Sequence, residues 1–176
     1  MLKKKVCLLG SFAVGKTSLV ARFVHSMFSG QYHTTVGVRV DKKVLEIDGQ
    51  PLTLMIWDLA GDEEGAPIRL HQARDASGYL LVADGTRAST LDTARSIHQR
   101  VENEIGMRPF LLLINKADLR DTWDIADQAW TDLAKTGWTV IETSALTGEH
   151  VEEAFTTLAG RVLKDQADNS RHEDGH

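Results

Sequence analysis

Three short runs of consecutive apolar residues restrict the folds open to this chain more than any other feature. They occupy residues 6–9, 79–83 and 110–114. Unbroken apolar runs of this length are typical of strands buried on both faces of a parallel sheet. None approaches the roughly 18 residues that a membrane-spanning helix needs. The runs therefore predict an α/β fold, and 176 residues suffice for one domain with a sizeable core.

The remaining segments complete a strand-and-helix alternation. Polar residues on both faces of the strand-like segment 38–47 indicate an edge strand, and Asp48-Gly49-Gln50 predicts a hairpin leading into the next strand. We expect a six-stranded, mostly parallel sheet with one antiparallel edge strand and about five helices on both faces. Residues 1–164 are predicted to form one domain, and the polar residues 165–176 a disordered tail. The expected helices span 17–25, 91–105, 125–135 and 151–164, and the other strands 52–58 and 138–141.

A glycine-rich motif follows the first apolar run directly. Residues 10–17 read Gly-Ser-Phe-Ala-Val-Gly-Lys-Thr, which is G-x-x-x-x-G-K-T between a predicted strand and a predicted helix. Backbone N–H groups of such a loop wrap a phosphate at the helix N-terminus, where the helix dipole favours negative charge. Lys16 would reach the β- and γ-phosphates, and the Thr17 hydroxyl would bind Mg²⁺. The alternative is a glycine turn with a surface lysine, but the spacing and placement favour the phosphate site.

The motif that recognises the nucleotide base is predicted after the 110–114 strand, in Asn115-Lys116-Ala117-Asp118. A carboxylate can accept two parallel N–H bonds from the guanine edge, a pair that adenine lacks, so Asp118 selects guanine. The Lys116 stem can lie across the base plane, and Asn115 can tie this loop to the phosphate loop. After the last predicted strand, backbone N–H groups in residues 142–146 could contact the guanine O6.

A metal site is predicted at the end of the hairpin strand, in Asp58-Leu-Ala-Gly61. The Asp58 carboxylate can hold Mg²⁺ through a water, because Mg²⁺ gives up its hydration reluctantly. The Gly61 N–H can bond the γ-phosphate. Upstream, either Thr34 or Thr35 could complete the metal shell. A loop held only by such contacts orders with a nucleoside triphosphate and relaxes after hydrolysis.

Together these motifs resemble those of the Ras-like small GTPases, closest to the Rab and Rho branches, over about residues 4–164. The resemblance implies a GTP/GDP switch that hydrolyses GTP with Mg²⁺. It makes Thr35 rather than Thr34 the metal ligand, and places Phe28 near the guanine. It also implies that effector, exchange and GTPase-activating proteins bind two switch regions, residues 28–39 and 59–75. The implied catalytic residues are Lys16, Gly61 and Asp62, and the metal residues Thr17, Thr35 and Asp58. The implied nucleotide-binding residues are Ala13, Val14, Gly15, Lys16, Thr17, Ser18, Phe28, Thr35, Gly61, Asn115, Lys116, Asp118, Leu119, Ser144, Ala145 and Leu146.

Asp62 departs from the family pattern, because most members carry glutamine there to orient the attacking water. An ionised aspartate near a triphosphate meets a repulsion of about 3 kcal/mol at ~5 Å with an effective dielectric near 20. We therefore expect slow intrinsic hydrolysis, although a carboxylate could also accept a hydrogen bond from the water. A different class of function, a pseudo-GTPase that holds GTP without turnover, fits the same substitution. Phe12 either crowds out an incoming arginine finger or shields the phosphates.

Four arginines lie on or beside the switches, at positions 22, 39, 69 and 74. One could act as an arginine finger in cis, and the alternative is solvated charge or effector contact. The net charge of −5 argues against nucleic acid as a partner and against unaided binding to anionic lipid. The sequence shows no signal peptide and no C-terminal lipidation cysteine. We expect a cytoplasmic monomer without an intrinsic membrane anchor, recruited to membranes by a partner if at all.

Overall fold

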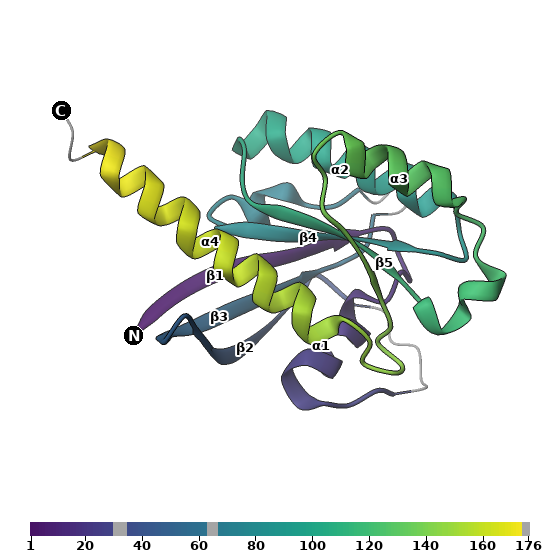
Figure 1. The fold of residues 1–176 in the computed structure, drawn as a ribbon, viewed down its shortest axis with the longest axis horizontal. Helices are drawn as coiled ribbons and strands as arrows, with labels where there is room; N and C mark the ends of the chain where they lie inside the picture. The colour runs from purple at the N-terminus through teal and green to yellow at the C-terminus, as the bar shows by residue number, and fades with distance from the viewer. Residues whose placement is uncertain (30–34, 63–66, 174–176) are drawn as a thin grey trace.

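The computed structural model describes residues 1–29, 35–62 and 67–173. Strands and helices alternate along this part of the chain, as Figure 1 shows. The strands are β1 Leu2–Gly10, β2 Val38–Ile47, β3 Gln50–Leu59, β4 Gly78–Asp84, β5 Phe110–Asn115 and β6 Val140–Thr143. The α-helices are α1 Lys16–His25, α2 Ser89–Ile105, α3 Asp127–Lys135 and α4 Val151–Glu173, and the 3₁₀ helices are η1 Leu70–Ala73 and η2 Ala117–Thr122.

The six strands form one sheet in the order β2-β3-β1-β4-β5-β6. Only the β2–β3 pair is antiparallel, and all the other neighbours are parallel. The predicted α/β fold with one antiparallel edge strand is confirmed. The three apolar runs lie in β1, β4 and β5, where every residue is buried except the partly buried Phe110.

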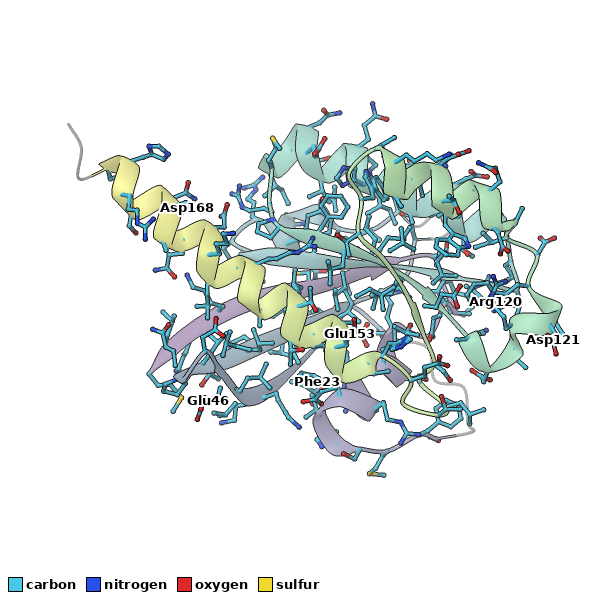
Figure 2. The ribbon with its side chains drawn as sticks, in the orientation of Figure 1. Phe23, Glu46, Arg120, Asp121, Glu153 and Asp168 are labelled. Atoms are coloured by element: carbon cyan, nitrogen blue, oxygen red, sulfur yellow. The ribbon has the colours of Figure 1, made fainter. Side chains whose placement is uncertain are left out.

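Helices cover both faces of the sheet, as predicted. Helices α1 and α4 lie on one face, and α2 and α3 lie on the other (Figure 1). Phe23 of α1, labelled in Figure 2, stacks on Phe155 of α4 with ring centroids 4.1 Å apart and planes 1° from parallel. This contact fixes the helix that follows the phosphate loop against the C-terminal helix.

The β2–β3 hairpin carries parts of both predicted switch regions, residues 28–39 and 59–75. Its turn residues Asp48 and Gly49 both have positive φ, which matches the right-handed twist of the flanking strands. At the other end Val38 pairs with Leu59, and the Ala60 N–H donates to the Gly37 carbonyl at 2.9 Å. The end of segment 28–39 is therefore hydrogen-bonded to the start of segment 59–75.

The part of the chain that the structure describes holds four α-helices and two 3₁₀ helices, where about five helices were expected. One expectation needs correction. Helix α4 continues past Lys164 to Glu173, so residues 165–173 are not the predicted disordered tail. They contain no glycine or proline, and Asn169 bonds Asp165 along the helix. This end of α4, with Asp168, extends beyond the sheet (Figures 1 and 2).

No helix among these described residues is both long and apolar enough to cross a bilayer. Residues 174–176 of the predicted tail lie outside the described part of the chain.

Candidate nucleotide-binding site

The phosphate loop lies between β1 and α1. A Cβ at Gly10 would come within 2.4 Å of the Val82 carbonyl oxygen, so only glycine lets β1 end this close to β4. The loop then turns through Ala13 and Gly15, whose φ angles are 65° and 103°. No side chain caps α1, which begins at Lys16. The helix therefore offers backbone N–H groups and the positive end of its dipole to an anion.

Lys16 folds back over its own loop. Its Nζ donates to the carbonyl oxygens of Gly10 at 3.2 Å and Ser11 at 2.9 Å. Burial lowers the pKa of this ammonium to about 8. The loop thus places a cation where a phosphate charge is expected.

Asp58 is buried at the end of β3 beside two hydroxyls. The Thr17 hydroxyl donates to Asp58 Oδ2 at 2.5 Å and lies 2.7 Å from the Thr35 hydroxyl. The other oxygen, Oδ1, is buried and has no hydrogen-bond partner among the described residues. Burial raises the pKa of this carboxyl. A carboxylate oxygen without a partner beside two hydroxyls fits the oxygen ligands that Mg²⁺ prefers; Thr34, the alternative ligand, lies outside the described residues.

Asn115 joins three loops at the carboxyl ends of the strands. Its Nδ2 donates to the Val14 carbonyl at 3.0 Å, and its Oδ1 accepts from the Thr143 hydroxyl at 3.2 Å. Asp118 is fixed in turn by the Ser144 hydroxyl, which donates to Oδ1 at 2.7 Å. The predicted link between the base loop and the phosphate loop is therefore present.

Lys116 is held in the left-handed region, with φ 71°, by two contacts that the sequence did not indicate. Its Nζ lies 2.7 Å from Asp84 Oδ2, and its carbonyl accepts from Trp123 Nε1 at 2.8 Å. The Trp123 ring packs so closely on Gly85 that a Cβ there would lie 2.1 Å from it. Burial opposes ionisation of Asp84, but hydrogen bonds from Lys116 and Thr86 outweigh it and hold the pKa of Asp84 below its usual range.

These loops surround a cavity of about 520 Å³. Most of the predicted nucleotide-binding residues line it. The exceptions are Val14 and Ser144, which contact lining residues through the hydrogen bonds above. Of the predicted metal and catalytic residues, Asp58 and Asp62 do not line the cavity. The predicted residues on its walls are Ala13, Gly15, Lys16, Thr17, Ser18, Phe28, Thr35, Gly61, Asn115, Lys116, Asp118, Leu119, Ala145 and Leu146.

The Asp62 carboxylate bonds on the α2 side of the site. Its Oδ1 accepts from the Ile68 N–H at 2.8 Å and lies 3.4 Å from Arg100 NH1. Its backbone pairs with the phosphate loop: the Asp62 N–H donates to the Gly10 carbonyl at 2.9 Å. Residues 63–66 of the second switch and 30–34 of the first lie outside the described part of the chain. The sequence offered no signal for Arg100, which sits on α2 among other exposed charges.

Arg22, one of the four arginines considered for a finger in cis, is half-buried and contacts a loop instead: Nε donates to the Ala145 carbonyl at 2.8 Å and NH2 to the Leu146 carbonyl at 2.5 Å. Arg39 forms an ion pair with Asp41 at 3.1 Å.

Comparison with known proteins identifies the family. The Ras family model matches residues 5–164. GTP-binding protein ypt2 of Schizosaccharomyces pombe is 34% identical over 166 residues, which span 93% of this chain and 83% of the relative. Ras-related protein Rab-7L1 of Rattus norvegicus is 35% identical over 96% of this chain and 84% of its own length. Ras-related protein SEC4 of Saccharomyces cerevisiae is 32% identical over 95% of this chain and 78% of its own length.

The family match covers the sheet, the phosphate loop and the loops around the cavity, and the relatives match over most of their lengths. The chain therefore belongs to the Ras family.

Proposed function

We propose that this Ras family protein is a GTP/GDP switch that holds its nucleotide with Mg²⁺ and hydrolyses GTP slowly without a partner. The observation that carries the proposal is one cavity with a phosphate loop at one end and Asp118 at the other. Its volume of about 520 Å³ is within the range of small-molecule sites. The name of the ypt2 relative, a GTP-binding protein, supports the same ligand.

At the phosphate end, each residue has a distinct task. The N–H groups at the start of α1 and the Lys16 ammonium bind the phosphates, and the Gly61 N–H bonds the terminal one. Thr17 and Thr35 would hold Mg²⁺ directly and Asp58 through a water. When bound, Mg²⁺ neutralises charge on the phosphate oxygens.

At the base end, Asp118 accepts two N–H bonds from guanine and rejects adenine. The Ser144 hydroxyl, 2.7 Å from Asp118 Oδ1, orients the carboxylate for this task. The Lys116 stem covers one face of the base, and its ammonium is fixed by Asp84. Rejection of adenine is strong because the wrong base leaves a carboxylate without its donors.

Slow hydrolysis follows from the contacts of Asp62. Its carboxylate is engaged by the Ile68 N–H and by Arg100, so it does not orient an attacking water. The same observation favours a second candidate, a pseudo-GTPase that holds GTP without turnover.

Regulation is proposed to act through the switch regions 28–39 and 59–75. Val36 is 90% exposed, so apolar surface is offered to effectors, exchange factors and GTPase-activating proteins. A partner of this kind would also recruit the protein from the cytoplasm to a membrane.

The test is single-turnover hydrolysis by protein loaded with GTP that carries a labelled γ-phosphate, started with Mg²⁺ and compared with an Asp62→Gln variant. Retention of GTP but not ATP, with slow release of phosphate, supports the proposal. We expect the glutamine variant to be faster; removal of the ~3 kcal/mol repulsion alone corresponds to roughly 100-fold.

Three other outcomes are informative. Tight GTP binding with no phosphate release from the native protein selects the pseudo-GTPase. Fast release from the native protein that is lost in the Asp62→Gln variant shows that Asp62 is a working catalytic residue. Equal retention of ATP and GTP contradicts the guanine switch. An Asp121→Asn variant, altered on η2 outside the cavity, is the matched control (Figure 2).

A further inference from the structure

Arg22 makes an unusual contact for a residue on α1. Its guanidinium donates to two consecutive carbonyls, those of Ala145 and Leu146, at 2.8 and 2.5 Å. The side-chain stem lies 3.5 Å from the position that a Cβ would take at Gly148. One side chain thus contacts both the start and the end of residues 145–148, which we call the base-edge loop.

We infer that Arg22 is a positioning residue for guanine recognition, which turns the N–H groups of the base-edge loop toward the oxygen at position 6 of the base. The inference rests on the proposed function and deepens it. It assigns a specificity role to a residue that does not touch the nucleotide.

Peptide geometry supplies the reason. The C=O and the N–H of one planar trans peptide point in opposite directions, so the Ala145 carbonyl shares its plane with the Leu146 N–H. Drawing that carbonyl toward Arg22 turns the Leu146 N–H to the opposite side. Ala145 and Leu146 both line the cavity, so the inference places this N–H on the cavity side. The next N–H, of Thr147, donates to the Ser144 hydroxyl at 3.1 Å, whereas the Leu146 N–H has no partner among the described residues.

Charge and helix geometry strengthen the arrangement. Bonds from a guanidinium are stronger than bonds between neutral groups, and its planar fork suits two adjacent acceptors. Lys16, which begins α1, is six residues before Arg22, so the two lie about 9 Å apart along the helix axis. The same helix therefore sets the position of the phosphate loop and of the base-edge loop.

Arg22 should therefore favour purines with an oxo group at position 6. Guanine and hypoxanthine carry this oxygen. In 6-thioguanine a sulfur, which is a weak hydrogen-bond acceptor, replaces it while the edge that faces Asp118 is unchanged. The analogue thus separates the contribution of the base-edge loop from that of Asp118.

The experiment measures dissociation of labelled GDP and labelled 6-thio-GDP at fixed Mg²⁺, chased with excess GDP. The proteins are the native chain, Arg22→Ala, Arg22→Lys and the control Arg95→Ala, which alters an exposed arginine on α2. We expect Arg22→Ala to release GDP about tenfold faster, the loss of one charged hydrogen bond's contribution. Release of 6-thio-GDP should be fast from the native chain and rise by only about twofold in Arg22→Ala.

The two remaining variants test whether the effect belongs to the Arg22 guanidinium. Arg22→Lys keeps the charge with a single donor group and should fall between the native chain and Arg22→Ala, whereas Arg95→Ala should match the native chain. Equal acceleration of both nucleotides, or no acceleration of GDP, overturns the positioning role. A native chain that retains neither nucleotide overturns the proposed function itself.

Discussion

The contact between Asp62 and Arg100 should stabilise the second predicted switch region by a measurable amount. We call this ion pair, together with the bond from the Ile68 N–H to Asp62, the latch. Oδ1 of Asp62 lies 3.4 Å from Arg100 NH1 and 2.8 Å from the Ile68 nitrogen. Without screening by salt, and at an effective dielectric of 20, the Coulomb attraction between the two charges would be about 5 kcal/mol. Both side chains are partly exposed, so roughly 1 kcal/mol is the realistic magnitude.

The perturbation is Arg100→Met, which keeps an unbranched side chain and removes the charge. Hydrogen exchange of the Ile68 amide in the GDP-loaded protein reports the latch, because that N–H donates to Asp62. Losing about 1 kcal/mol should raise its exchange rate about fivefold. In the native chain added salt should raise the rate as well, since salt screens the pair, whereas in Arg100→Met it should not.

Two results would refute this reasoning. Unchanged exchange of the Ile68 amide in Arg100→Met would show that the ion pair contributes nothing to the latch. A rate in the native chain that is independent of salt would show that the carboxylate is held by the backbone bond alone. Arg95→Met, on the same helix but without an ion pair among the described residues, controls for the loss of positive charge.

Three further predictions follow from contacts around the site and in the core. Trp123→Phe keeps an aromatic ring but loses the hydrogen bond to the Lys116 carbonyl, which contributes about 1 kcal/mol. Stopped-flow release of a fluorescent GDP analogue should therefore be about fivefold faster. Phe155→Ala removes the ring stacked on Phe23 and should cost about 3 to 5 kcal/mol, lowering Tm by roughly 10 °C at fixed GDP in calorimetry. Because the folded pKa of Asp84 is depressed, its ionised form stabilises the fold above the unfolded pKa near 4, and this contribution is lost as pH falls through the folded pKa. Asp84→Asn should therefore lower the free energy of unfolding in urea titrations near pH 7, and the difference should shrink toward about pH 3.

The sheet and the phosphate loop could be predicted because their signals are local. An apolar run followed by glycines at fixed spacing indicates a strand and a loop without reference to any other part of the chain. The ends of strands and helices are harder to predict from the sequence than their presence. Strand β6 begins at Val140 rather than at Trp138, because its pairing with β5 begins at Leu112. Trp138 instead packs its ring against Phe110.

The supporting contacts of the site could not be predicted, because their partners are far apart in the sequence. Arg22 lies 123 residues from the carbonyl that it fixes. Arg100 lies 38 residues from Asp62. A charged residue on an amphipathic helix looks the same in sequence whether it faces solvent or a loop carbonyl. Only the folded arrangement tells them apart.

The β2–β3 hairpin has a mechanical consequence. Its open end joins the two switches through the pairing of Val38 with Leu59 and the bond from Ala60 to Gly37. The two predicted switch regions therefore share these contacts, and displacement of either region strains the same hydrogen bond between Ala60 and Gly37. A regulator that binds one region and displaces it also displaces the other. The free-energy changes caused by substitutions at Gly37 and at Ala60 should therefore be non-additive, as expected for residues in contact.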